Sequence, residues 1–284
     1  MDRVQTKREI EHTLAAMGRR PLKRFGQHFL VDGNLMRRLV ECAELSPDDC
    51  VLEVGPGTGG LTDLLVPRVR RVVAVEIDRT MHAILSDRFQ DATNVILVLG
   101  DVLDGKHHLA IPLVEAMSDP SVGDIKLVAN LPYQIATPLI LNLLVQFPRV
   151  RRFCFTVQAE VGDRITAEPG GRDYGPLAIL CQLLCNIAVI ARLRPLCFWP
   201  APHVDSVMLR LDVREHPLVP REDIAAFSEF VRGVFDHRRK QLRAALNYVW
   251  GECPPPPLRA DFDLTRRPEQ LTIHEWLELY RAKT

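Results

Sequence analysis

The stretch VLEVGPGTGGLT, residues 51–62, decides the fold of this chain. A short apolar segment that is typical of a buried strand leads directly into a glycine-rich turn, and an amphipathic helical pattern follows. Glycine is needed in such a turn because the backbone adopts unusual dihedral angles and because a ligand approaches where a Cβ would collide. The stretch therefore predicts the nucleotide-binding strand, turn and helix of an open α/β sheet.

The glycines of this turn admit two interpretations. Gly55, Gly57 and Gly60 satisfy G-x-G-x-x-G, the dinucleotide-binding pattern of oxidoreductases. Glu53 argues against a dehydrogenase, in which an apolar strand residue usually stands two positions before the first glycine, and no hydride-transfer site is evident. E-x-G-x-G-x-G is instead similar to the first motif of S-adenosylmethionine-dependent methyltransferases. We therefore expect Glu53, Gly55 and Gly57 to bind that cofactor.

Acidic residues follow two further apolar strands. Glu76 ends the strand at residues 72–75, at the spacing where nucleotide-binding sheets place a ribose-binding acid. Asp78 is a competing acid, whose alternative role is to cap the next helix. Asp101 follows the strand at residues 95–99, where its carboxylate can accept a hydrogen bond from the adenine amino group of the cofactor. The alternative for Asp101 is a surface turn.

The tetrapeptide NLPY, residues 130–133, follows the apolar run at residues 125–129. This order suits methylation of an exocyclic amino group on a flat base. The Asn130 side chain and the Leu131 carbonyl can accept the amine's hydrogens, Pro132 shapes the turn, and the Tyr133 ring can stack on the base. Phe198 can close the other face of the base. By itself, the tetrapeptide is also compatible with a strand that ends in a proline turn.

Taken in order, these motifs resemble those of the ribosomal RNA adenine N6,N6-dimethyltransferases of the KsgA type. GQHFLVD, residues 26–32, is similar to the family's G-Q-N-F-L segment, which folds over the methionine end of the cofactor, with His28 in place of the usual Asn. VQAEVGDR, residues 157–164, and FWPAPHVDS, residues 198–206, are similar to two further family motifs. The resemblance implies cofactor contacts at Gln27, His28, Leu30, Gly55, Glu76, Asp101 and Asn130.

The resemblance also implies a fold. We expect a seven-stranded Rossmann-like S-adenosylmethionine-dependent methyltransferase fold with a small C-terminal all-helical domain. The predicted parts are an N-terminal helical extension at residues 1–20, a methyltransferase domain at 21–213 and a helical RNA-binding domain at 214–284. Apolar residues at helical spacing over 221–250 and again over 258–280, separated by the prolines at 254–257, predict the last part. Strands are expected near Val51, Val72, Val95, Leu127, Phe153, Ile187 and Val207.

A basic stretch, HRRKQLR at residues 237–243, suggests contact with nucleic acid. We expect it to lie on a helix and to bind phosphates without sequence preference. The stretch resembles the R-R-K-x-L-R segment of the family, although a basic helix face is commonly just solvated. The candidate RNA-binding residues are Arg232, Arg238, Arg239, Lys240 and Arg243.

Composition limits the class of protein. The 284 residues, with 47% hydrophobic and 25% charged residues, suffice for one large α/β domain and a smaller second one, and the net charge of zero gives no argument for nucleic-acid binding. The seven cysteines without a C-x-x-C pair argue against a disulfide framework or a metal site. Residues 1–20 lack the apolar core of a secretory signal, and residues 176–191 are too short to span a membrane. We expect a cytoplasmic monomer.

The sequence therefore predicts an enzyme that dimethylates N6 of adenines in a hairpin of small-subunit ribosomal RNA, within a partly assembled subunit, with a role in ribosome biogenesis. One alternative is a large-subunit ribosomal RNA adenine methyltransferase that confers antibiotic resistance, which we expect to carry another residue between Asn130 and Pro132. A second alternative, a non-catalytic ribosome-assembly factor, predicts degenerate cofactor residues, whereas Glu53, Glu76 and Asp101 are all present.

Overall fold

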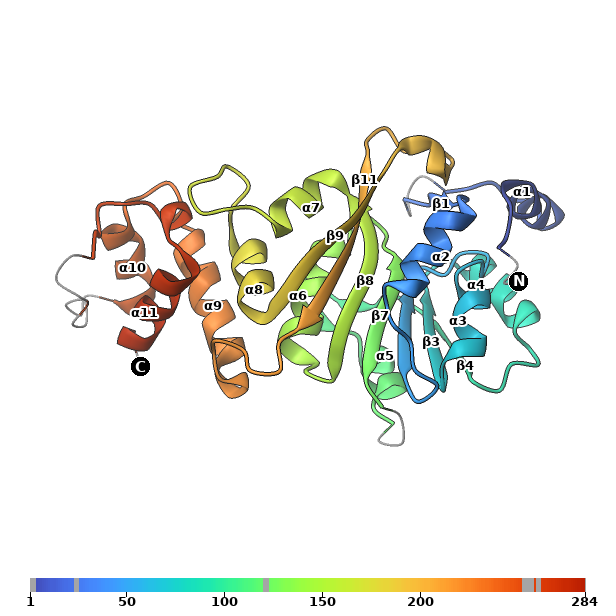
Figure 1. The fold of residues 1–284 in the computed structure, drawn as a ribbon, viewed down its shortest axis with the longest axis horizontal. Coiled ribbons are helices and arrows are strands. Elements are labelled where there is room, and N and C mark those ends of the chain that lie inside the picture. Colours follow the sequence, from blue (N-terminus) through green and yellow to red (C-terminus); the bar gives the residue numbers. More distant parts are fainter. Residues whose placement is uncertain (1–3, 23–25, 120–122, 252–257, 259–261, 284) are drawn as a thin grey trace. The chain divides into compact units, whose positions relative to one another are not determined.

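The computed structural model describes residues 4–22, 26–119, 123–251, 258 and 262–283 (Figure 1). The chain forms two compact units. The first contains residues 1–161 and 188–212, and the second contains residues 162–187 and 213–284. The second unit is therefore built from two separate stretches of chain, whereas the sequence placed a single boundary at residue 213.

A seven-stranded sheet in the order β4-β3-β2-β7-β8-β11-β9 organises the fold. β2 is parallel to β3 and β7, β8 is parallel to β7, and β11 is antiparallel to β8. The seven strands lie where the sequence predicts them, which confirms the expected fold class. They are β2 (Cys50–Val54), β3 (Arg71–Glu76), β4 (Val95–Leu99), β7 (Ile125–Asn130), β8 (Val150–Gln158), β9 (Cys185–Leu193) and β11 (Ser206–Val213).

The strand order places a ligand site. From β2 the chain continues outward through β3 and β4, and it then returns to lay β7 on the other side of β2. The carboxyl ends of β2 and β7 therefore flank a topological switch point, where open α/β sheets bind their ligands. The glycine turn follows β2 directly, and Asn130 ends β7.

Helices cover the sheet between these strands. The apolar faces of α2 and α3 pack on one face of the sheet, in a core that includes Leu39, Leu64 and Val128. Asp32 begins α2 by accepting the Asn34 and Leu35 backbone N–H groups. Asp78 begins α4 in the same way, by accepting the Thr80 N–H, and thus has the capping role weighed above. The helices are α2 (Gly33–Glu41), α3 (Thr62–Leu65), α4 (Arg79–Arg88), α5 (Ile111–Met117) and α6 (Ala136–Gln146).

The chain near its N-terminus forms the helix α1 (Lys7–Ala16), which packs on the first unit (Figure 1). A capping box between Thr6 and Glu9 fixes its first turn. Ile10 and Leu14 are buried against Met81 of α4. Short strand pairs complete this unit: β1 (Phe29–Leu30) with β10 (Phe198–Trp199), and β5 (Leu103–Asp104) with β6 (His108–Leu109).

The second unit is helical and has an aromatic core. Phe230 contacts the rings of Trp250, Trp276 and Tyr280, at centroid distances between 5.9 and 6.2 Å. The last predicted helix is shorter than expected, because α11 begins only at Ile273. The prolines at 254–257 lie outside the described residues. The helices are α7 (Ala159–Ile165), α8 (Pro176–Leu184), α9 (Ile224–Phe235), α10 (Leu242–Trp250) and α11 (Ile273–Lys283).

Residues 237–241 of the basic stretch do not lie on a helix, so this part of the prediction was wrong, and only Leu242 and Arg243 belong to α10. The α-helical hydrogen bonds of α9 end at Asp236, residues 236–240 form turns, and α10 begins only at Leu242. The backbone N–H groups of Leu242 and Arg243 instead donate to the Arg266 and Leu264 carbonyls, at 2.7 and 3.0 Å. These bonds fix the turn between the two helices.

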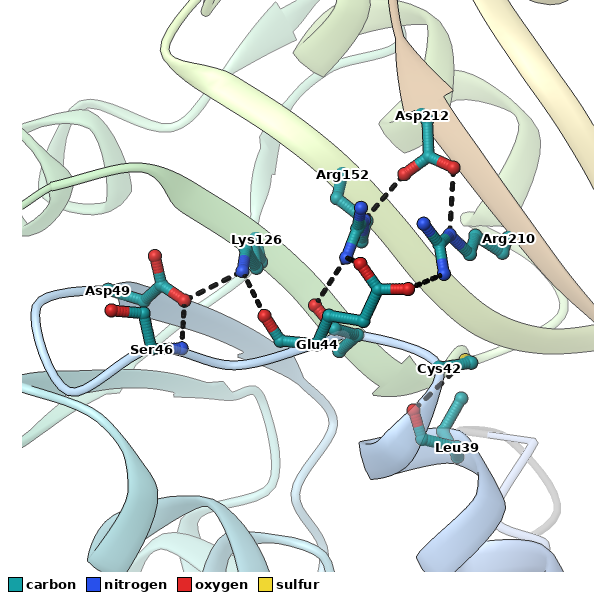
Figure 2. Close-up of polar contacts among 10 residues, drawn as sticks. Leu39, Cys42, Glu44, Ser46, Asp49, Lys126, Arg152, Arg210 and Asp212 are labelled. Atoms are coloured by element: carbon teal, nitrogen blue, oxygen red, sulfur yellow. Dashed lines mark hydrogen bonds and ion pairs between the residues drawn. The ribbon is translucent and has the colours of Figure 1, made fainter.

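A charged network lies at the amino ends of the parallel strands β7 and β8, at the opposite end of these strands from the switch point (Figure 2). The Lys126 ammonium on β7 contacts the Asp49 carboxylate at 2.7 Å and donates to the Glu44 carbonyl at 2.6 Å. Arg152 on β8 and Arg210 on β11 bind the Glu44 carboxylate at 2.7 and 2.5 Å. Their hydrogen bonds lower the pKa of Glu44 to about 2. The network ties the loop after α2 to three strands. Among the described residues, no helix has the length and apolar character needed to cross a membrane.

Candidate functional site

A pocket lies at the switch point, where the carboxyl ends of β2, β3, β4 and β7 meet residues 26–29. It brings together most of the residues that the sequence singled out. The predicted residues that line it are Gln27, His28, Gly55, Gly57, Glu76, Asp101, Asn130, Leu131, Pro132 and Tyr133.

The glycine turn needs its glycines for two reasons. Gly55 and Gly57 have φ angles of 70° and 59°, in the left-handed region that favours glycine. A Cβ on Gly57 would lie 2.7 Å from a ring carbon of Phe29, and one on Gly55 would lie 3.0 Å from Pro132. The turn is thus a cradle that any larger residue would fill, as expected where a cofactor approaches the backbone.

Glu76 is the acid that the structure builds into this cradle. Its carboxylate accepts the Gly57 N–H at 3.1 Å and the Asp78 N–H at 2.9 Å. Burial raises its pKa to about 7. The competing acid Asp78 caps α4 and also accepts a hydrogen bond from the Gln27 side chain at 3.2 Å. Asp101 is exposed and accepts the Leu103 N–H at 3.0 Å.

The Asn130 amide is held from both sides. The Thr156 hydroxyl donates to its oxygen at 2.5 Å, and its nitrogen donates to the His28 carbonyl at 2.7 Å. Thr156 lies opposite Asn130 on β8 and is fully buried. Sequence reasoning missed Thr156, and only the parallel register of β7 and β8 reveals its role. The two bonds orient the amide, with its oxygen toward Thr156 and its nitrogen toward the His28 carbonyl.

Tyr133 presents its ring to the pocket in a fixed position. Its hydroxyl is 2.9 Å from the Ser206 hydroxyl, and burial raises its pKa. The ring stacks with the imidazole of His28 at a centroid distance of 5.6 Å. His28 Nδ1 lies 2.6 Å from the Pro200 carbonyl, so that nitrogen carries the hydrogen and donates it. The side chain of His28 is therefore held by a hydrogen bond to the protein backbone.

Three predicted residues do not line this pocket. Phe198 is only 3% exposed and packs in the hydrophobic core, where it pairs with Leu30 between β10 and β1. Leu30 and Glu53 line a smaller adjoining cavity, which shares Phe29, Gly55 and Asn130 with the pocket. Glu53 accepts the Thr62 hydroxyl at 2.7 Å, and burial raises its pKa to about 8.

The basic cluster, defined as Arg232, Arg238, Arg239, Lys240 and Arg243, belongs to the second unit. All of these side chains are exposed except that of Arg232, which is half-buried on α9. Arg238 donates to the Arg172 carbonyl at 3.3 Å, and Lys240 donates to the Tyr248 hydroxyl at 2.9 Å. Cationic groups thus gather around the turn between α9 and α10.

The fold and the pocket define a class. A seven-stranded sheet with a glycine cradle, a buried acid at the tip of β3 and an Asn at the tip of β7 is a Rossmann-like S-adenosylmethionine-dependent methyltransferase. A family model described as "Ribosomal RNA adenine dimethylase" matches residues 19–253. The chain belongs to the ribosomal RNA adenine dimethylase family, and it is an enzyme that uses S-adenosylmethionine.

Relatives cover almost the whole chain. It is 37% identical over 285 aligned residues to ribosomal RNA small subunit methyltransferase A of Moorella thermoacetica, with 99% of each chain covered. It is 41% identical over 220 residues to the protein of that name from Geobacillus kaustophilus, with 78% of this chain and 74% of the relative covered.

Two solved structures share the fold. A dimethyladenosine transferase from Plasmodium falciparum aligns with a TM-score of 0.68 at 24% identity, over 89% of this chain and 96% of that one. The 23S rRNA methyltransferase ErmE aligns with a TM-score of 0.62 at 26% identity, over 89% of this chain and 98% of that one.

Proposed function

We propose that this enzyme dimethylates N6 of adenines in small-subunit ribosomal RNA during ribosome biogenesis. The observation that carries the proposal is the Asn130 amide, held by Thr156 and His28 at the mouth of a cofactor pocket beside Tyr133. The relatives named above support the small subunit as the substrate. The likeness to ErmE keeps a large-subunit substrate as the alternative.

The residues of NLPY would act on the target amine. The bound cofactor supplies an electrophilic methyl group on its sulfonium. The N6 lone pair of adenine is delocalised into the ring, so the amine is a poor nucleophile until it becomes tetrahedral. The Asn130 oxygen and the Leu131 carbonyl accept the N6 hydrogens and stabilise that geometry as charge develops. Pro132 shapes the turn, and the Tyr133 ring stacks on a base that has been flipped from its helix.

Dimethylation follows from the same arrangement. A monomethylated amine keeps one hydrogen that Asn130 can accept, so a second transfer can use the same site. No general base is required, because the methylated amine is acidic enough to lose its proton to water.

Phe198 is buried in the core. In this structure the aromatic ring that stacks with Tyr133 is instead the imidazole of His28.

The cofactor would lie along the carboxyl edge of the sheet. Glu76 accepts the ribose hydroxyls, Asp101 accepts from the adenine amino group, and Gly55 and Gly57 allow close approach. Residues 27–30 and Glu53 surround the methionine end. Asn130 lies between this end and the target amine.

We expect the affinity for S-adenosylmethionine to rise with pH because of Glu76. Burial raises the pKa of its carboxyl to about 7, and ribose hydroxyls donate to the ionised form. One such group predicts about tenfold tighter binding at pH 8 than at pH 6. Glu53, whose pKa is about 8, acts in the same direction. Calorimetric titrations across this range test the expectation, and Glu76→Gln should make the rise about tenfold smaller than in the parent. The same rise in the variant and the parent would remove Glu76 from the site.

The basic cluster would hold the RNA backbone. Replacing Arg238, Arg239 and Lys240 with Ala should weaken subunit binding and reduce the slope of log K against log salt by about 2, for three lost phosphate contacts. Cofactor affinity should stay unchanged. The same measurement on a variant with Arg37 and Arg38 replaced, two exposed arginines of α2, serves as the control. Equal salt slopes for the triple variant and the parent would make the cluster a solvated surface.

The substrate is proposed to be RNA within a partly assembled subunit, bound by a cytoplasmic monomer. The deciding experiment is transfer of labelled methyl groups to purified small subunits and, in parallel, to purified large subunits, both lacking the modification, followed by nucleoside analysis. Dimethyladenosine in the small-subunit RNA is the expected product. Label confined to large-subunit RNA would support the alternative, and no label in either RNA would support an assembly factor.

A further inference from the structure

The smaller cavity beside the pocket has a wall that the sequence did not anticipate. Glu53 and the glycine turn form one side, and Gln5 and Ile10 form another. Gln5 stands two residues before α1, in a part of the chain for which the sequence predicted a helix and assigned no role. The cavity therefore brings the chain near its N-terminus against the cofactor site.

Gln5 is fixed by contacts with the glycine turn. It is 4% exposed, and its side-chain oxygen accepts the Thr58 hydroxyl at 2.6 Å. The same oxygen would lie 3.1 Å from a Cβ on Gly60, so the amide packs directly on the turn. The capping box of α1 and the burial of Ile10 hold this segment in place.

The Gln5 side chain can still donate hydrogen bonds through its amide nitrogen. Its oxygen is engaged by Thr58, whereas its amide nitrogen has no hydrogen-bond partner within the described parts of the chain. An amide nitrogen donates two hydrogen bonds and accepts none. This nitrogen is not sealed in the protein interior, so a ligand in the cavity that supplies an acceptor can reach it.

We propose that the Gln5 amide nitrogen donates a hydrogen bond to the carboxylate of the cofactor's methionine moiety. That moiety is an α-amino acid, with a carboxylate that accepts and an ammonium that donates. The cavity offers one group for each, because Gln5 donates and the Glu53 carboxylate accepts. The inference rests on the proposed position of the methionine end beside residues 27–30 and Glu53.

The test compares two ligands by calorimetric titration of the full-length protein. S-adenosylhomocysteine carries the amino acid group, and 5′-methylthioadenosine lacks it. Gln5→Ala should bind S-adenosylhomocysteine about 10- to 100-fold more weakly than the parent, as expected for one lost hydrogen bond to a charged group. Binding of methylthioadenosine should not change. Gln5→Glu should lose at least as much affinity, because it keeps an oxygen for Thr58 but repels a carboxylate.

Two further variants separate the explanations. Arg8→Ala removes an exposed side chain of α1 and leaves the Gln5 amide in place, so it should leave both affinities unchanged. Glu53→Gln should weaken only the binding of S-adenosylhomocysteine. If Gln5→Ala weakens both ligands equally, or neither, Gln5 does not contact the carboxylate. If Glu53→Gln also leaves the binding of S-adenosylhomocysteine unchanged, the position proposed for the methionine end fails as well.

Discussion

Asn130→Ala is expected to lower the rate of methyl transfer roughly 10²- to 10³-fold, which corresponds to about 2.7 to 4 kcal/mol of transition-state stabilisation. The Thr156 hydroxyl and the His28 carbonyl preorganise the amide, so its oxygen is already placed when the amine becomes tetrahedral. This geometry exists mainly in the transition state, and small-subunit binding should therefore change little. Single-turnover rates with small subunits, measured at saturating S-adenosylmethionine, test the expectation.

Tyr133→Phe is the matched control for Asn130→Ala. If Tyr133 acts by stacking, its ring suffices and the variant should keep substantial activity, although it loses the contact with Ser206. Thr156→Val should fall between the two variants, because it frees the amide without removing it. Near-parental turnover in Asn130→Ala together with an inactive Tyr133→Phe would reverse these roles. A proton transfer through the Tyr133 hydroxyl would then replace the proposed mechanism.

The sequence could predict the sheet and much of the site because both depend on local patterns. Apolar runs of strand length, each ending in an acid or a glycine, locate the carboxyl ends of β2, β3 and β4. Parallel strands bring those ends to one edge, so Gly55, Glu76 and Asp101 meet without any long-range information. The positive φ angles of Gly55 and Gly57 confirm the turn chemistry that the glycines predicted.

The contacts that the sequence could not predict are non-local. Thr156 reaches Asn130 only through the register of β7 and β8, and Gln5 reaches Thr58 from 53 residues away. Phe198 belongs to a motif that was expected to contact the target adenine, but its pairing with Leu30 places its side chain in the hydrophobic core. Helical spacing continues on both sides of residues 236–240, so periodicity alone could not reveal the turn there.

The carboxyl and amino ends of the parallel strands carry different kinds of polar residue. At the switch point, Asn130 and Glu76 line an open pocket. At the amino ends, Lys126 and Asp49 form a pair whose side chains are 10% and 6% exposed. Such a pair contributes little when it is intact, because both ions have lost their hydration, but breaking it leaves one buried charge without a partner. Substitutions in this pair should therefore affect stability rather than catalysis.

Asp49→Asn is accordingly expected to lower the free energy of unfolding by about 3 to 5 kcal/mol, the usual cost of removing one partner from a buried ion pair. The Asn oxygen can still accept the Ser46 N–H, which Asp49 accepts at 2.6 Å, so the loss reports on the charge. Urea unfolding measures the change. The double variant Asp49→Asn with Lys126→Met carries neither charge and should recover much of the stability. Cofactor affinity, measured where each variant is folded, should match that of the parent. Unchanged stability in Asp49→Asn would show that the Lys126 ammonium finds water or the Glu44 carbonyl sufficient, and that this end of the strands tolerates an unpaired charge.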